Sequence, residues 1–172
     1  MAETNDNALP ESPAQAFKEA MRRLAATVTI VTAAKGDESY GMTMTAVTSL
    51  SMDPPSLVIC VNRNASLHPV LAGRQEAPFC VNLLHHDHQD AATAFAGAAE
   101  RTDRFATGSW EYDESGTPYL ADAQASLFCT VDAALSYGSH SIFVGTVKRV
   151  RLEGQIAPLL YSDGRYAKLV GG

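Results

Sequence analysis

The sequence predicts a mainly β fold, an antiparallel barrel with a few short helices. Six or seven apolar or β-branched stretches have the length of strands, and tight turns such as Gly36-Asp37 and Asp163-Gly164 connect them. Helical patterns are few and do not alternate regularly with the strands. A GxGxxG motif between a strand and a helix is missing, so the ordinary fingerprint for binding a dinucleotide is absent.

Composition indicates one domain of an intracellular protein. The 172 residues are enough for one core, which we place in residues 13–172 after a disordered tail of residues 1–12. The net charge of −6, without a cluster of Lys and Arg, argues against nucleic acid as a partner. No apolar run is long enough to span a membrane, and the first residues do not form a signal peptide. Three cysteines in apolar runs, Cys60, Cys80 and Cys129, predict free buried thiols and a reducing cytoplasm.

The first elements are a helix and a β-hairpin. Ser12 is placed to cap a helix that has Pro13 at its first position. Its apolar residues recur at helical spacing, and they are Phe17, Ala20, Met21 and Leu24. Residues 27–33 then alternate as a strand, turn at Gly36-Asp37 and return through Tyr40.

The middle of the chain predicts two strands around a proline turn. Residues 42–52 are rich in Thr and Ser and uncharged, which favours a strand with small polar side chains. Asp53-Pro54-Pro55 forces a turn, and residues 56–62 form an apolar strand that ends in Asn62. Asn64 is expected to cap a helix over residues 65–71, where Ser66 and free backbone N–H groups would suit a phosphate.

The rest of the chain continues the β pattern. Residues 78–84 read as a strand, and Asp87 is expected to cap an alanine-rich helix that ends near Gly97. Residues 100–122, rich in Gly, Thr, Ser and acidic side chains, are expected to form a surface excursion. Further strands are predicted at 125–136, 141–153, 159–161 and 166–170, and the second of these alternates unevenly.

Taken together, these segments resemble the short-chain flavin reductase family. The order and spacing of several motifs carry the resemblance, which covers roughly residues 16–169. The motifs are Gly41 with its Thr/Ser-rich strand, Asp53-Pro54-Pro55, the apolar strand to Asn62, Ser66-Leu67-His68, FCVNLL at 79–84, Arg104-Phe105, GSHSIFVGTV at 138–147 and YSDGRY at 161–166.

This resemblance implies a fold, an activity and partners. The fold is the FMN-binding split β-barrel, antiparallel and of Greek-key type, usually a homodimer with the flavin near the subunit interface. The activity is NAD(P)H-dependent reduction of non-covalently bound FMN or FAD. The reduced flavin would pass to a flavin-dependent monooxygenase.

The resemblance also implies flavin contacts. They are Thr43, Met44, Thr45, Ala46, Ser49, Val61, Asn62, Ser66, Asn82, Leu83 and Arg104. Amides such as those of Asn62 and Asn82 both donate and accept, which suits the edge of an isoalloxazine ring. The simpler interpretations are a threonine-rich edge strand, two turn-forming asparagines and a solvated arginine.

Nicotinamide contacts are implied for three more residues. His140 enters an apolar strand as in the family's Gly-Asp-His-x-Ile-Phe pattern, and Arg165 and Tyr166 follow the last turn. Ser139 replaces the usual Asp, so no carboxylate is expected to fix the tautomer of His140. Hydride transfer to a flavin needs positioning rather than a protein nucleophile, so His140 is the one catalytic candidate.

Two alternatives stay open at this point. One is a flavin-binding protein without reductase activity. The other is a metal-dependent enzyme that uses His85, His86 and His88 beside Asp87. Ligands adjacent in sequence rarely converge on one ion, so we interpret these histidines as helix-capping residues and expect no metal site.

Overall fold

A computed structural model describes residues 12–98, 100 and 103–170. The expected tail, residues 1–12, lies outside this part except for Ser12. The helical segments are α1 (Pro13–Met21), α2 (His68–Ala72), η1 (His86–His88), α3 (Gln89–Thr93), η2 (Ala94–Ala98) and η3 (Arg104–Ala106). The strands are β1 (Ala26–Thr27), β2 (Thr29–Lys35), β3 (Glu38–Met44), β4 (Val47–Met52), β5 (Pro55–Asn62), β6 (Pro78–Leu83), β7 (Trp110–Tyr112), β8 (Pro118–Leu120), β9 (Ala125–Tyr137), β10 (His140–Leu152), β11 (Leu159–Ser162) and β12 (Arg165–Lys168).

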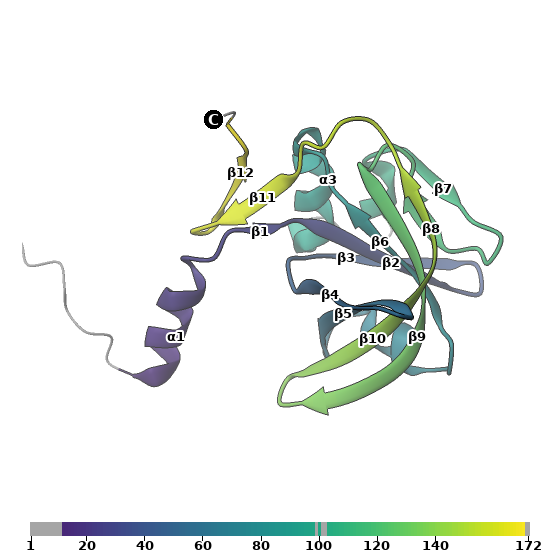
Figure 1. Ribbon diagram of the computed structural model, residues 1–172, viewed down its shortest axis with the longest axis horizontal. Coiled ribbons are helices and arrows are strands. Elements are labelled where there is room, and N and C mark those ends of the chain that lie inside the picture. The colour runs from purple at the N-terminus through teal and green to yellow at the C-terminus, as the bar shows by residue number, and fades with distance from the viewer. Residues whose placement is uncertain (1–11, 99, 101–102, 171–172) are drawn as a thin grey trace, which may run out of the picture.

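Seven strands form one antiparallel sheet that curls into a barrel (Figure 1). Its order is β3-β2-β6-β9-β10-β5-β4, so consecutive strands β3 and β4 lie at opposite edges. Only Thr45 and Ala46 join them, and the two edges must therefore approach each other. The predicted mainly β antiparallel fold is confirmed, but the single strand expected at 42–52 is wrong.

The break in that strand is a tertiary effect. The N–H of Val47 donates to the carbonyl of Thr45 at 2.9 Å, and the N–H of Cys60 donates to the carbonyl of Ala46 at 3.1 Å. These bonds turn the chain away from β2 and onto β5. A run of residues with uniform β propensity gives no local signal for such a turn.

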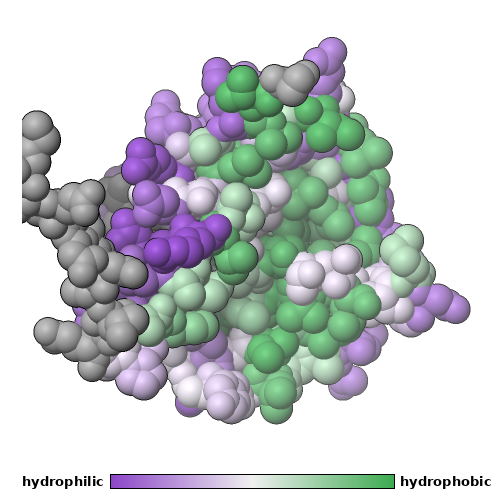
Figure 2. Space-filling view, turned by 60° about the vertical axis from the view of Figure 1, so that its left-hand side comes forward, coloured by the Kyte–Doolittle hydropathy of each residue, from purple (hydrophilic) through white to green (hydrophobic). Residues whose placement is uncertain are grey.

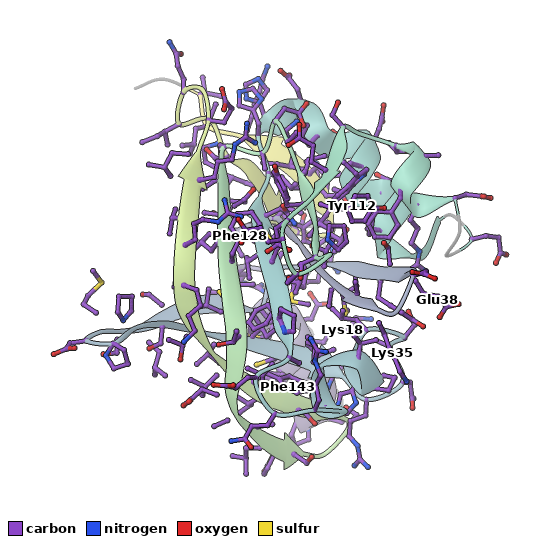
Figure 3. All side chains as sticks on the ribbon, turned by 90° about the vertical axis from the view of Figure 1, so that its right-hand side faces the viewer. Lys18, Lys35, Glu38, Tyr112, Phe128 and Phe143 are labelled. Carbon is purple, nitrogen blue, oxygen red and sulfur yellow. The ribbon has the colours of Figure 1, made fainter. Side chains whose placement is uncertain are left out.

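The longest hairpin joins β9 to β10 through a turn at Gly138, whose φ is +56°. The two predicted strands are confirmed. Their register shifts between Val144 and Gly145 and again between Val147 and Arg149, which accounts for the uneven alternation in the sequence. The side chain of Phe143 in β10 is fully buried and belongs to the apolar core (Figure 3).

Two apolar clusters stabilise the molecule. The first lies inside the barrel and includes Phe79 and Phe143. The second packs against α3 and includes Phe95 and Leu120. Residues 100–122 contribute to the second cluster, because Leu120 is fully buried and Trp110 packs 5.1 Å from the ring centroid of Phe95. The expected surface excursion is therefore wrong: it contains the β7-β8 hairpin, which closes one end of the core.

A small sheet and a projecting helix lie beside the barrel. The sheet has the order β1-β11-β12, and it confirms the final predicted pair of strands. In α1, the hydroxyl of Ser12 accepts from the N–H of Gln15 at 3.2 Å, as predicted for a cap. Arg22 binds Asp163 through two nitrogens, and this contact holds the end of α1 on the β11-β12 turn. None of the residues of α1 is buried, and the helix extends away from the barrel (Figure 1).

The caps of the other helices differ from the sequence prediction. The helix expected at 65–71 begins only at His68, and Leu67 rather than Asn64 precedes it, with no side-chain cap. Asp87 is not the cap of α3: it lies inside η1, which His85 caps because its Nδ1 atom accepts from the N–H of Asp87 at 3.3 Å. α3 follows η1 directly and has no side-chain cap. The alanine-rich segment does end near Gly97, whose φ is +104°.

The three cysteines are free thiols, as predicted. Cys80 and Cys129 are buried, whereas Cys60 is partly exposed, so the expected burial is wrong for Cys60. Burial raises the pKa of Cys129 to about 12 and that of Cys80 well above its ordinary value. Both are therefore neutral and packed as apolar groups. Among the described helices, none is long and apolar enough to span a membrane.

Candidate functional site

The corner between β3 and β4 separates two hollows. The first, here called the polar pocket, has a volume of about 520 Å³. It is lined by Met42, Asn64, Ala65, Ser66, Phe95, Ala96, Gly97, Glu100 and Arg104. Its volume lies in the range of small-molecule sites, and it combines an apolar floor with a few polar groups.

Arg104 supplies the positive charge of the polar pocket. It lies in η3, and its Nη1 atom donates to the carbonyl of Gly41 in β3 at 3.2 Å. Gly41 has no room for a side chain, because an added Cβ would lie 2.6 Å from the Cε1 atom of Phe95. The close contact of β3, Phe95 and Arg104 therefore depends on a glycine at this position. Glu100 also lines the polar pocket, and its negative charge offsets part of the positive charge of Arg104.

The turn after β5 forms the opposite side of the polar pocket. The side-chain oxygen of Asn62 accepts from the N–H of Asn64 at 2.9 Å, and its backbone carbonyl accepts from Ala65 at 3.0 Å. Asn62 is thus the turn-forming residue that the simpler interpretation predicts. The turn leaves Ser66 exposed at the pocket, so a hydroxyl and a guanidinium border the same space.

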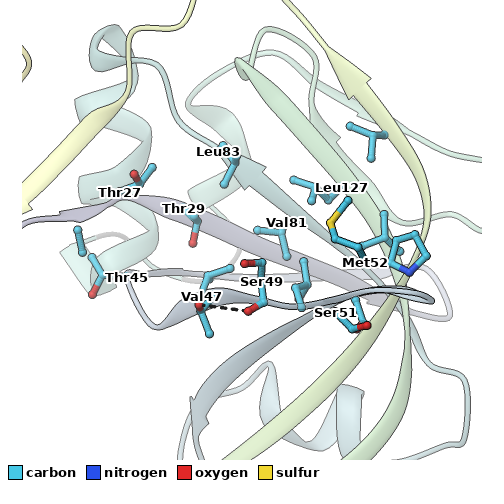
Figure 4. Close-up of a pocket in the computed structure, with 17 residues that line it drawn as sticks. Thr27, Thr29, Thr45, Val47, Ser49, Ser51, Met52, Val81, Leu83 and Leu127 are labelled. Atoms are coloured by element: carbon cyan, nitrogen blue, oxygen red, sulfur yellow. Dashed lines mark hydrogen bonds between the residues drawn. The ribbon is translucent and has the colours of Figure 1, made fainter.

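The second hollow, here called the apolar hollow, also has a volume of about 520 Å³ (Figure 4). Three of the predicted flavin contacts, Thr45, Ser49 and Leu83, lie here rather than at the polar pocket. None of the described residues that line it carries a charge. Figure 2 shows a broad hydrophobic area with a hollow at its middle. This hollow lacks a group to neutralise a phosphate.

The corner itself places three predicted residues between the hollows. The hydroxyl of Thr43 donates to the carbonyl of Ala92 at 2.7 Å, so it fixes β3 to α3. Met44 is 7% exposed, and its carbonyl accepts from the hydroxyl of Thr29. Ala46 is exposed. The side chains of Thr43 and Met44 are therefore structural, and what the corner offers a ligand is backbone.

Asn82 does not reach either hollow. It is fully buried, and its amide donates to the carbonyl of Ile30 at 2.9 Å while its oxygen accepts from the N–H of Leu120 at 2.9 Å. The strands of Asn62 and Asn82 are not neighbours, because β9 and β10 lie between β5 and β6. The expectation that the two amides share one ring edge is wrong.

Val61 is also fully buried in the barrel core. The N–H of its neighbour Cys60 points toward Ala46, and strand alternation therefore turns the N–H and C=O of Val61 toward β10. The structure gives Val61 a place in the core and in the ladder rather than at the site.

The three predicted nicotinamide contacts are far apart within one chain. His140 begins β10, whereas Arg165 and Tyr166 lie in β12 of the small sheet, which the chain reaches after the other end of β10. Figure 1 shows β12 at the end of the molecule opposite the β9-β10 turn, where His140 lies. One chain cannot bring these residues to a single nicotinamide ring.

His140 itself lies next to the polar-pocket turn. It is opposite Asn62 in the ladder, and the N–H of Arg63 donates to the carbonyl of Ser139 at 2.9 Å. The hydroxyl of Ser139 lies 2.9 Å from Nδ1 of His140. A hydroxyl thus orients the ring where the family pattern has a carboxylate.

His68 is a residue whose role the sequence did not reveal. Its Nε2 atom lies 2.9 Å from the hydroxyl of Ser141, and its ring packs against Phe143 at 5.5 Å between centroids. Burial, and then the charge of Arg63, lower the pKa of His68. It is a neutral link between α2 and β10, the strand that carries His140, and its only sequence signal is the Ser66-Leu67-His68 motif.

Several residues of the polar pocket were also missed. Met42, Phe95 and Gly97 line it, although they read as ordinary apolar and helix-ending residues in the sequence. The signal that was present is glycine: Gly41 lies within β3 where Phe95 packs against it, and Gly97 ends the alanine-rich segment with a positive φ.

Comparisons with known proteins identify the family of the chain. A family model described as flavin reductase like domain matches residues 21–170. The reductase component of an FADH(2)-dependent resorcinol hydroxylase from Rhizobium sp. is 42% identical over 163 residues, which are 94% of this chain and 90% of that protein. An FMN reductase (NADH) from Methylorubrum extorquens is 39% identical over 169 residues, covering 98% and 83% of the two chains.

Solved structures resemble the whole chain. An NADH:FAD oxidoreductase from Streptomyces globisporus has a TM-score of 0.85 and 30% identity, and the match covers 100% of this chain and 96% of that one. The flavin reductase component of a bacterial two-component tryptophan halogenase has a TM-score of 0.82 and 28% identity, with 92% and 99% covered.

Proposed function

The chain belongs to the flavin reductase-like family, and on that basis we propose that it is an NAD(P)H:flavin oxidoreductase that transfers a hydride to FMN or FAD. The observation that carries the proposal is the polar pocket, where Arg104 and Ser66 border a cavity with Phe95 and Met42 at its floor. An anionic ligand with a flat apolar ring requires this combination of groups.

The residues present fit a flavin in two respects. Arg104 and Ser66 are suited to hold the phosphate, and the turn that Asn62 organises presents backbone next to them. Thr45 and Ala46 are exposed at the corner between the two hollows. Their carbonyls already accept from Val47 and Cys60, so the groups we assign to the polar edge of the ring are their backbone N–H donors. The bound flavin would supply the acceptor for the hydride, so the protein contributes orientation and charge.

His140 is proposed to guide the nicotinamide. Its place beside the turn of Asn62 and the orienting hydroxyl of Ser139 support this role. Arg165 and Tyr166 are proposed to act at the site of a second subunit, since they cannot reach His140 of their own chain.

A homodimer is proposed for the same reason and for a second one. The apolar hollow is bordered by large exposed side chains, among them Met52 at 85% and Val150 at 50% exposure. Monomers rarely expose a continuous apolar area of this kind. A second copy that covers it would place subunit contacts next to the corner at Thr45.

The proposed product is reduced flavin for a separate oxygenase. Two of the relatives are named as reductase components of a hydroxylase and of a halogenase. A pocket that uses one arginine and several uncharged groups suits a flavin that must leave after reduction, because few charges hold its phosphate.

The test is oxidation of NADH and of NADPH by the purified protein with added FMN or FAD. We expect turnover with at least one of the four pairs. A folded protein that binds flavin but oxidises neither nucleotide would support the non-catalytic alternative. A folded protein that neither binds flavin nor oxidises NAD(P)H would overturn the assignment of the polar pocket.

A further inference from the structure

A second group of convergent polar side chains lies outside the polar pocket, where the chain leaves β6 and enters η1. The Nδ1 atom of His85 lies 3.3 Å from one carboxylate oxygen of Asp87, and the Nε2 atom of His86 lies 3.3 Å from the other. Their ligand atoms all lie within 4.8 Å of one another. The rings of these two sequence neighbours lie 4.1 Å apart, although adjacent residues rarely converge on one ion.

These distances fit the coordination sphere of a transition metal. In a tetrahedral site with metal–donor bonds of about 2.0–2.1 Å, adjacent donor atoms lie roughly 3.3 Å apart. Each imidazole nitrogen lies at this distance from one oxygen of Asp87, a different oxygen for each histidine. We propose that His85, His86 and Asp87 bind a divalent cation of the zinc class through two imidazole nitrogens and one carboxylate. This donor set suits Zn²⁺, Ni²⁺ and Cu²⁺ better than Mg²⁺ or Ca²⁺, which prefer oxygen.

The hydrogen bonding of His85 leaves its Nδ1 atom without a proton. This atom accepts from the N–H of Asp87 at 3.3 Å, a long hydrogen bond that uses its one lone pair, so a cation bound at Nδ1 would replace this bond. The same atom faces a carboxylate oxygen at 3.3 Å, and two electron-rich atoms at that distance repel each other. A cation between His85 and Asp87 converts this repulsion into attraction.

The backbone holds the two histidines in place. The N–H of His86 donates to the carbonyl of Ala157 at 2.9 Å, and His85 forms a β-bridge with Pro158. The N–H of His85 donates to Nδ1 of His88 at 3.2 Å. The segment is thus fixed from both sides, which reduces the ordering that an ion would impose.

The surroundings also favour a cation and leave it accessible. Asp122 and Glu153 line a hollow next to His85 and Asp87 and add negative charge. The side chain of Asp87 is 74% exposed, while those of His85 and His86 are 26% and 33% exposed. An ion can enter from the Asp87 side, and water can complete its coordination.

The experiment titrates the full-length, EDTA-treated protein with zinc chloride at pH 7.5. Isothermal calorimetry measures binding, and thermal melts measure stability with and without zinc. We expect one zinc ion per chain and a higher melting temperature. His86→Ala and Asp87→Asn, which keep the side chain of His85, should each weaken binding at least tenfold. His140→Ala removes an exposed histidine elsewhere and should leave zinc binding unchanged.

Two outcomes would overturn the proposal. One is no zinc binding by the wild-type protein, and the other is equal binding by a folded His86→Ala/Asp87→Asn double variant. Cys60, a partly exposed thiol, is the competing ligand in the second case, and loss of binding in Cys60→Ser would identify it. Flavin is not added in these measurements, so their result is independent of the proposed reductase activity.

Discussion

At the scale of single residues, Arg104 is the side chain on which flavin affinity should depend most. A hydrogen bond to a charged group contributes about 1.5–3 kcal/mol, which corresponds to roughly 10- to 100-fold in affinity. Arg104→Ala should therefore weaken FMN binding by that factor in a fluorescence titration. Arg74→Ala, an exposed arginine after α2, is the matched control and should bind normally. Equal affinity in both variants would move the phosphate away from the polar pocket.

His140 should affect reduction more than binding. If its ring contacts the incoming nicotinamide, His140→Ala slows flavin reduction by NADH and leaves the affinity for oxidised flavin nearly unchanged. Stopped-flow reduction, a flavin titration and a thermal melt separate these effects. A histidine that only supports the β9-β10 turn through Ser139 would instead lower the melting temperature with a normal reduction rate.

His68 predicts a pH dependence of stability. Because its pKa is lowered in the folded state, the unfolded chain binds the proton more readily below the ordinary pKa of about 6.5. Stability is therefore unaffected above that pH and falls as the pH decreases toward the folded-state pKa. The drop in melting temperature between pH 7.5 and pH 5.5 should be smaller in His68→Gln than in the wild-type protein. An identical drop in both would assign the pH dependence to other groups.

At the scale of elements, two glycines set the packing of strands against phenylalanines. A Cβ on Gly41 would lie 2.6 Å from Phe95, and a Cβ on Gly145 would collide with Phe79. Overpacking of this kind costs about 1–3 kcal/mol. Urea unfolding should show a loss of that size for both Gly41→Ala and Gly145→Ala.

The two variants should differ in function. Phe95 lines the polar pocket, whereas Phe79 belongs to the barrel core, so only Gly41→Ala should also weaken flavin binding. If both variants bind flavin like the wild-type protein, the floor of the pocket does not contact the ligand.

At the scale of the whole molecule, the apolar hollow should govern assembly. We expect the wild-type protein to elute with twice the 18.3 kDa mass of one chain in size-exclusion chromatography with light scattering. Met52→Asp places a charge at the hollow on a side chain that is 85% exposed, and it should shift the protein to the monomer without loss of folding. Ile156→Asp, at a residue that is 92% exposed and outside the hollow, should remain dimeric. A monomeric wild-type protein, or a dimeric Met52→Asp, would refute this interface.

The sequence by itself determined the class of fold, most strands, the cap at Ser12 and the family. These features depend on neighbouring residues: alternation, proline and glycine at turns, and the order of short motifs. The sequence also predicted Ser66 and Arg104 as flavin contacts. The structure brings these two residues, which are distant in the sequence, to one pocket.

Only the tertiary structure decided which polar residues lie near the surface and which are buried in the core. Asn62 ends β5 and Asn82 lies one residue before the end of β6. Asn62 organises an exposed turn, whereas Asn82 is fully buried and hydrogen-bonds the backbone of Ile30 and Leu120. Both asparagines follow a run of apolar residues, so the local sequence does not distinguish them. The order of the strands in the sheet gives them different surroundings. The corner at Thr45 and Ala46 has the same cause, because the chain turns there to reach β5, a partner that no local pattern specifies.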